Sequence, residues 1–381
     1  GDKFGRSLCL STNMALIGAD RVDTAAGKDS GGAYVFSRSG SNWIQQAKLT
    51  ASDGVAGDQF GCAVSLSGDT ALVGAEGANT SGGDNAGAAY VFVRSGTNWS
   101  QQARLIAEDS YFWDFFGRSV SVSGDTAFIG VPEADPVGYN SGKTYIFRRS
   151  GDSWAQQAML ISSNGGMFGH CVSVSGDTAL VAAPSANAVH VFVNSGSRWS
   201  QETVLHADDA TGGDFFGGSA SLSGDRALIG SVWDSTPDGY EAGSAYVFTR
   251  SGTNWTQQAH LTAPAGAPYD EFGNSVCLDG DTALVAAIGD DNPGIGGPGS
   301  AYVFTCSGTN WSEQAMLCTG ESGAWNRFGF SVSLFGDTAL IGAPYDDTPG
   351  GGSAGSAYVL TRSGGGWSQE ALLIASDAPP E

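Results

Sequence analysis

The chain has little positive charge. Among its 381 residues, 17 are Lys or Arg and 39 are Asp or Glu, so the formal net charge is −22. A charge of this size repels phosphate backbones and anionic membranes at long range, which argues against a nucleic-acid partner. No run of about 18 apolar residues is present, so direct membrane insertion is not expected either. The first residues lack the basic and apolar regions of a leader, and we expect any export signal to lie outside this sequence.

Familiar catalytic and metal-binding motifs are also missing. The six cysteines have no CxxC spacing, which excludes the usual zinc and redox motifs. Cys9 and Cys277 stand where other copies of the repeat described below have Ser, so small buried residues are favoured over a disulfide framework. The four histidines are scattered, without a HExxH pair, a nucleophile elbow or a phosphate loop. Paired carboxylates need only meet in three dimensions, so a glycan-cleaving enzyme stays open as an alternative.

The sequence contains one motif that is repeated seven times. Each copy begins with Phe-Gly and continues with four short segments, which in the second copy read AVSLS, TALVGA, AAYVFVR and WSQQARL. These segments alternate or are β-branched, and Gly, Ser, Asn or Asp bound them, as is typical of strands. The Phe-Gly pairs start at Phe4, Phe60, Phe116, Phe168, Phe216, Phe272 and Phe328.

Four antiparallel strands repeated about every 50 residues predict the blades of a propeller. We therefore expect an all-β fold, a seven-bladed β-propeller with four strands per blade, that forms a single domain over residues 1–381. The Trp and Tyr that recur in the copies are interpreted as blade packing. The two ends of the chain match the ends of a repeat, so they should meet at one seam, which we expect to be the weakest joint of the ring.

The motifs resemble a known family. Phe-Gly, then Gly342-Ala343-Pro344 or its variants, then a segment like GSAYVF is similar to the FG-GAP repeat of integrin α-subunit propellers. The resemblance covers essentially the whole chain and implies a role in extracellular adhesion and recognition. The calcium loop of integrin-type repeats, DxDxDGxxD, is absent, because the turn is reduced to forms such as Ser67-Gly68-Asp69-Thr70. We interpret the single Asp of each such turn as a turn residue.

Recognition is expected in the parts that the copies do not share. The turns between strands one and two and between strands three and four are short and uniform, whereas the other connections are long and irregular. Alternating strand direction places these variable loops on one face of the ring. Blade four has short loops, which predicts a notch edged by aromatic residues and carboxylates. The candidate ligand-binding residues on this face are Trp113, Asp135, Tyr139, Trp233, Asp234, Tyr240 and Trp325.

Two further kinds of site are suggested by residue type. Adjacent carboxylates at Asp290-Asp291 and Asp346-Asp347 are candidate ligands for Ca²⁺ on the loop face, with a solvated acidic rim as the alternative. Asn-x-Ser/Thr sequences make Asn79, Asn98, Asn254 and Asn310 candidate glycosylation sites.

Three hypotheses for function follow. The first is an extracellular or cell-surface binding or adhesion module, not an enzyme, whose partner is a glycan or an extracellular protein. The second is a propeller glycoside hydrolase or lyase that uses carboxylates of the loop face. The third is a structural component of an extracellular assembly.

Overall fold

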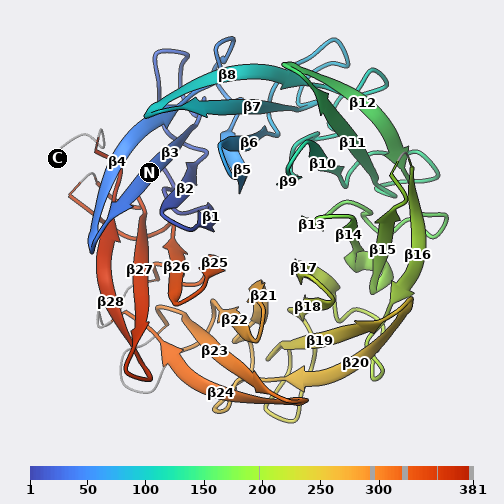
Figure 1. Ribbon diagram of the computed structural model, residues 1–381, viewed down its shortest axis with the longest axis vertical. Helices are drawn as coiled ribbons and strands as arrows, with labels where there is room; N and C mark the ends of the chain where they lie inside the picture. The colour runs from blue at the N-terminus through green and yellow to red at the C-terminus, as the bar shows by residue number, and fades with distance from the viewer. Residues whose placement is uncertain (197, 292–296, 320–324, 350, 377–381) are drawn as a thin grey trace.

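The chain folds into a ring of seven four-stranded sheets, shown in Figure 1. The computed structural model describes residues 1–196, 198–291, 297–319, 325–349 and 351–376. In chain order, the strands are β1 (Ser7–Ser11), β2 (Met14–Ala19), β3 (Gly32–Ser39), β4 (Asn42–Leu49), β5 (Phe60–Ser67), β6 (Thr70–Ala75), β7 (Ala88–Ser95), β8 (Asn98–Leu105), β9 (Ser119–Ser123), β10 (Thr126–Val131), β11 (Lys143–Ser150), β12 (Ser153–Leu160), β13 (Val172–Ser175), β14 (Thr178–Ala183), β15 (Ala188–Asn194), β16 (Trp199–Leu205), β17 (Phe216–Ser223), β18 (Arg226–Ser231), β19 (Ser244–Ser251), β20 (Asn254–Leu261), β21 (Phe272–Asp279), β22 (Thr282–Ala287), β23 (Ser300–Ser307), β24 (Asn310–Leu317), β25 (Ser331–Phe335), β26 (Thr338–Ala343), β27 (Ser356–Ser363) and β28 (Gly366–Leu373). One 3₁₀ turn, η1 (Pro184–Ala186), lies in blade four.

Each blade consists of four consecutive antiparallel strands, so the predicted seven-bladed propeller is confirmed. The first strand of every blade faces the central axis and the fourth forms the outer edge, as Figure 1 shows. The second strands are buried along almost their whole length, because they lie in the middle of the ring between two neighbouring blades. No helix of the described residues is long and apolar enough to cross a membrane.

Phe-Gly recurs because the Phe side chain packs in the core and the Gly allows close backbone contact between neighbouring blades. The Phe side chains are buried, and Phe60 packs against Tyr90 and Phe92 with ring centroids 5.5 and 5.9 Å apart. All seven Gly of the pairs have φ between 89° and 95°. A Cβ added to Gly61 would lie 2.4 Å from the carbonyl oxygen of Gly32, so the backbones approach too closely for any side chain.

The recurrent Trp joins neighbouring blades through a hydrogen bond as well as by packing. The indole Nε1 of Trp99 donates to Oε1 of Gln46 on the fourth strand of the preceding blade (3.3 Å). Trp154, Trp255, Trp311 and Trp367 donate in the same way to Gln102, Glu202, Gln258 and Gln314. Trp199 of blade four is instead buried against Phe128, and its Nε1 has no partner among the described residues.

The recurrent Ser of the first strands also links blades. Oγ of Ser65 accepts a hydrogen bond from the Val122 backbone N–H of the next blade (3.1 Å), and Ser121 and Ser173 do the same for Val174 and Leu222. Sγ of Cys9 takes this position opposite the Leu66 N–H (3.2 Å), and Cys277 takes it opposite Leu334. All six cysteines are free thiols, which agrees with the expectation that they do not form a disulfide framework.

The Asp of the short turn pairs with Arg of the third strand in four blades. Nε of Arg94 lies 2.7 Å from Oδ1 of Asp69. The other pairs are Arg149 with Asp125, Arg250 with Asp225 and Arg362 with Asp337. These Asp side chains are largely exposed, so each ion pair contributes modestly to stability.

The seam between blades seven and one repeats the contacts of the other interfaces. Trp43 Nε1 donates to Oε1 of Glu370 (2.9 Å), and Arg38 pairs with the same carboxylate. Ser331 Oγ donates to the Gly5 carbonyl (2.8 Å), and the N–H of Phe4 donates to the Ala354 carbonyl (3.0 Å). The seam thus has hydrogen bonds of the same kind as the other interfaces, and its relative weakness stays a prediction.

Candidate functional site

The loop face is the face formed by the connections between second and third strands and by the connections between blades. On this face the backbone is fixed while the side chains vary. In six blades, the backbone N–H two residues after the end of the second strand donates to a carbonyl of the connection that enters the same blade, as in Trp233 to Asp214 (3.1 Å) and Gly77 to Asp58 (3.1 Å). The seven blades have six residue types at this position, namely Arg21, Gly77, Glu133, Ser185, Trp233, Gly289 and Tyr345.

A second fixed position precedes each Phe-Gly pair. The residue there has a left-handed backbone in every blade, with φ between 54° and 62°, although none of the seven is Gly. These residues are Lys3, Gln59, Phe115, Met167, Phe215, Glu271 and Arg327. The repeat therefore places equivalent backbone positions around the ring, while the side chains at these positions vary from blade to blade. A scaffold that carries variable loops has this property.

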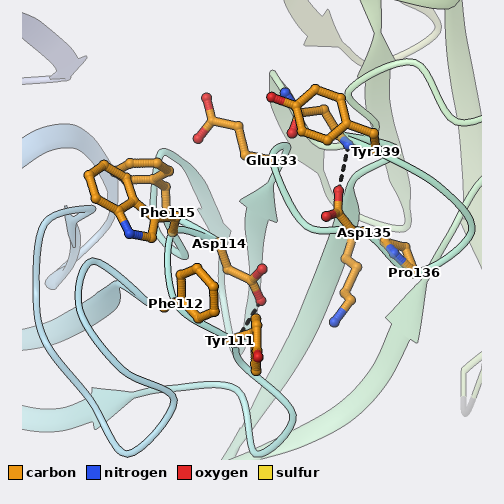
Figure 2. A pocket seen from close by; sticks show the side chains of 11 residues that line it. Tyr111, Phe112, Asp114, Phe115, Glu133, Asp135, Pro136 and Tyr139 are labelled. Atoms are coloured by element: carbon orange, nitrogen blue, oxygen red, sulfur yellow. Dashed lines mark hydrogen bonds between the residues drawn. The ribbon is translucent and has the colours of Figure 1, made fainter.

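A cleft with a volume of about 700 Å³, which we call the aromatic cleft, lies on the loop face of blades two and three (Figure 2). One wall comes from the connection between β8 and β9, and the other from the loop between β10 and β11. Its most exposed rings are Tyr111 (63%), Phe112 (50%), Trp113 (56%) and Tyr139 (89%). The lining residues are Tyr111, Phe112, Trp113, Asp114, Phe115, Glu133, Asp135, Pro136, Tyr139, Asn140 and Lys143.

The neighbouring loop of blade two holds the first wall in place. The N–H groups of Trp113 and Phe115 donate to the carbonyls of Asp84 and Asn85 (3.0 and 3.1 Å). Both residues have a left-handed backbone, with φ of 67° and 55°. This conformation is uncommon for bulky residues, so the contacts with blade two determine where the rings stand.

Two of the three carboxylates in the cleft serve the loops themselves. Oδ2 of Asp114 accepts the N–H of Tyr111 (2.9 Å), and Oδ1 of Asp135 accepts the N–H of Asn140 (2.6 Å). Equivalent bonds occur in other blades, for example at Asp214 and Asp347. Burial raises the pKa of Asp114, although its hydrogen bond from Tyr111 acts in the opposite direction.

Glu133 is the carboxylate specific to this cleft. Its Oε1 lies 3.9 Å from Nε of Arg118, and its Oε2 has no hydrogen-bond partner among the described residues. Burial raises the pKa of Glu133, and the charge of Arg118 only partly offsets that effect. Arg118 is shared with Glu76, whose Oε2 is 2.9 Å away.

Lys143 is the only cation among the lining residues, and it is neutralised locally. Its Nζ lies 3.2 Å from Oδ2 of Asp109, which also accepts a hydrogen bond from the Tyr145 hydroxyl (2.6 Å). Burial raises the pKa of Asp109, but the Tyr145 and Lys143 contacts outweigh it, so this pKa lies below its usual value. The cleft thus combines exposed aromatic rings with hydrogen-bonding groups at its floor, an arrangement that suits stacking of a sugar ring.

The structure brings only part of the predicted site together. Trp113, Asp135 and Tyr139 line the aromatic cleft, whereas the predicted residues of blade five do not. Trp233 stacks on Phe215 with centroids 4.3 Å apart, and Tyr240 lies beside Tyr269 at 5.7 Å. Asp234 accepts hydrogen bonds from the Ser244 and Tyr246 hydroxyls. Trp325 is 79% exposed and belongs to a separate part of the loop face.

Sequence reasoning did not single out Phe112 and Glu133. Phe112 belongs to the run YFWDF, from which only the Trp was selected. Glu133 could have been found by aligning the copies, because it stands at the variable position that Trp233 and Tyr345 occupy in blades five and seven.

Three of the four candidate calcium ligands accept hydrogen bonds from the protein itself. Asp290 accepts the Tyr302 hydroxyl (2.6 Å), and Asp346 accepts the Tyr358 hydroxyl (2.9 Å). Asp347 accepts the N–H of Ser353 (2.7 Å), while Asp291 lies beside Gly297. In the described parts of the chain, no group of three or more His, Cys, Asp or Glu is placed to hold a metal ion.

One trio in blade five has the composition of a hydrolase triad but not its accessibility. Nε2 of His260 lies 2.8 Å from Oγ of Ser244, and its Nδ1 lies 3.4 Å from Oδ2 of Asp209. Ser244 is fully buried and its hydroxyl also contacts Asp234, so it cannot reach a substrate.

The four candidate glycosylation residues, Asn79, Asn98, Asn254 and Asn310, are all exposed, and their modification stays a prediction.

Comparison with known proteins gives a family match and similar solved structures. The family model described as FG-GAP repeat matches residues 1–36, 43–92, 99–147, 199–248, 255–304 and 311–360, leaving out most of blade four. No curated protein sequence matches the chain. A periplasmic gluconolactonase of Pseudomonas aeruginosa, PpgL, superposes with a TM-score of 0.61 at 16% identity, over 97% of this chain and 97% of that chain. U3-55K superposes with a TM-score of 0.58 at 9% identity, over 90% and 89%. At these identities the structural similarity concerns the fold alone.

Proposed function

Because the chain belongs to the FG-GAP repeat family, we propose that it is an extracellular binding module that recognises a glycan through the loop face of its propeller. The observation that carries this proposal is the aromatic cleft of blades two and three. Four large rings are half or more exposed there, although apolar rings on a soluble surface are normally covered. Aromatic rings provide a large contact area at low entropic cost and stack well on the apolar faces of sugars.

The proposal is tested with a glycan array followed by titration calorimetry. Replacing Trp113 by Ala should weaken binding of the selected glycan at least tenfold, which corresponds to about 1.4 kcal/mol. Trp325→Ala is the matched control, because it removes the same side chain from an exposed place outside the cleft. Unchanged affinity in the Trp113 variant would refute the role of the cleft, and binding of proteins but no glycans would refute the ligand class.

A glycoside hydrolase or lyase is the second candidate, because one observation favours it. Glu133 lines the cleft, and its Oε2 has no hydrogen-bond partner among the described residues. Burial also raises the pKa of Glu133, which is the direction of shift that a general acid requires. Incubating the bound glycans with the protein and analysing the products distinguishes the two functions: intact glycans support binding alone, and shortened chains support the enzyme.

A further inference from the structure

The seam between blades seven and one carries an unusual concentration of positive charge. Four cations and two carboxylates line a cavity of about 340 Å³ on the loop face, together with Gly1 and Tyr345. The cations are Lys3, Arg6, Arg21 and Lys28, and the carboxylates are Asp20 and Asp29. These four are nearly a quarter of the 17 Lys and Arg of a chain with a net charge of −22. We call this cavity the seam basic site.

The cations occupy the positions at which the scaffold presents variable side chains. Arg21 stands at the variable position after the second strand, Lys3 directly before Phe-Gly and Arg6 directly after it. In blade two the same three positions hold Gly77, Gln59 and Cys62. Blade one is the one blade in which all three are basic, so the charge is a feature of this blade and not of the repeat.

Aromatic rings of blade seven hold the cations close together. Nζ of Lys3 lies 3.1 Å from the centroid of the Tyr345 ring, and the Arg327 guanidinium lies 5.0 Å from the same ring. Arg6 lies 5.4 Å from the Phe330 ring. Cation–π contacts orient positive groups without neutralising them, so the N–H donors keep their charge for a ligand.

The carboxylates of the site compensate this charge only in part. Asp20 is buried and pairs with Nε of Arg6 at 3.1 Å, whereas Asp29 lies 3.9 Å from Arg21. Lys28 is exposed. Asp23 lies next to the site, and its Oδ1 accepts the N–H of Asp29 at 2.8 Å. Carboxylates beyond the screening length, about 8 Å at physiological ionic strength, act weakly on the cavity. The side chains that line the cavity thus carry more positive than negative charge in an acidic protein, while long polyanions are still repelled by the molecule as a whole.

From this arrangement we propose that the seam basic site binds the anionic group, a sulfate or a carboxylate, of an acidic saccharide. The cations come from two separate segments, the chain before β1 and the loop between β2 and β3, and they surround a cavity with room for one sugar residue. Arginine and lysine side chains that converge from several sides suit an oxyanion carried on a small ring. This inference rests on the proposed glycan-binding function, since it names the charge of the glycan.

The test uses three tetrasaccharides that share one backbone: a neutral form, a form with uronate groups and a form with sulfate groups. Each is titrated into the intact chain by calorimetry. At least one acidic form should bind ten or more times as tightly as the neutral form, and raising the salt concentration should remove the difference. Preference for sulfate and preference for uronate both support the site and identify its group. Equal affinity for all three forms overturns the inference.

Variants separate this site from the aromatic cleft. Arg21→Gln with Lys28→Gln removes two exposed cations and should abolish most of the preference for the acidic form. Arg148→Gln with Arg198→Gln removes the same charge from exposed positions of blades three and four and should retain the preference. An equal loss in both double variants would show a general charge effect and overturn the site. If Trp113→Ala abolishes binding of the neutral form while no acidic form is preferred, the proposed function stands and the seam basic site falls; if no form binds, both fall.

Discussion

The residue that follows each Phe-Gly pair varies between blades, and in blade four it is His170. Its ring packs edge-on against Phe215 with centroids 5.4 Å apart, and its Nδ1 has no hydrogen-bond partner among the described residues. Burial lowers the pKa of His170 to about 4, and the charge of Arg118 acts in the same direction. A side chain that must stay neutral in the folded protein makes folding sensitive to acid.

We therefore predict that His170 destabilises the fold as the pH falls from about 6.5, its unfolded pKa, toward about 4, because the unfolded chain then binds the proton and the folded chain does not. The loss should reach about 2 kcal/mol at pH 5. Replacing His170 by Asn, the residue at the corresponding place of blade six, should remove this part of the pH dependence. Chemical denaturation at pH 7 and pH 5 measures it, with the exposed His206→Asn as a control that keeps the wild-type behaviour.

Among the elements, the short loop of blade four shows how the fold tolerates a missing segment. In the other blades, the N–H of the Phe in Phe-Gly donates to a backbone carbonyl of the adjacent loop, as in Phe60 to Ser30 (3.0 Å). The loop between β14 and β15 is too short to supply it. Oδ1 of Asn187 accepts the Phe216 N–H instead (3.1 Å), and its Nδ2 donates to the Thr211 carbonyl (2.7 Å).

Asn187 also has a left-handed backbone, with φ of 48°, which Asn tolerates better than most residues. We predict that Asn187→Ala lowers the free energy of unfolding by about 1–3 kcal/mol, because it leaves a buried N–H without an acceptor. Asn187→Asp should cost less, since a carboxylate oxygen still accepts that bond. Denaturant titration measures both variants, and equal stability of the Ala variant and the wild type would contradict the assigned role.

For the whole molecule, the seam matters because no covalent link crosses it. At the seam, Glu370 accepts the Trp43 indole and pairs with Arg38, and between blades four and five Glu202 accepts the Trp255 indole and pairs with Arg250. The two carboxylates have similar exposure, 12% and 11%. The interfaces thus offer the same bonds, and they differ in whether the chain continues from one blade into the next.

We predict that Glu370→Ala and Glu202→Ala have unequal effects on local opening. Both remove the acceptor of a Trp indole, but only Glu370→Ala should accelerate hydrogen exchange throughout β1–β4 and β25–β28, because terminal blades can separate without stretching the chain. Glu202→Ala should affect exchange close to its own interface. Hydrogen exchange of both variants is measured by mass spectrometry. If exchange is faster only near the substituted interface in both variants, the seam is as stable as the other interfaces.

The amino-acid sequence by itself determined the architecture. Seven Phe-Gly pairs, four strand-like segments per copy and uniform turns were enough to predict the propeller, because a repeated pattern records the same local constraints many times. It also indicated that the loop face differs from blade to blade and that Trp113, Asp135 and Tyr139 are candidates. A shortened loop in blade four could be read from the spacing of the copies.

Only the tertiary structure decided which of those loop residues meet. Trp233 and Tyr240 resemble Trp113 and Tyr139 in the sequence, yet they pack on Phe215 and beside Tyr269 and do not line the cleft. The seam basic site joins Lys3 to Tyr345, residues at opposite ends of the chain. Such contacts depend on ring closure and on loop conformations that backbone bonds from a neighbouring blade impose, and neither leaves a local pattern in the sequence.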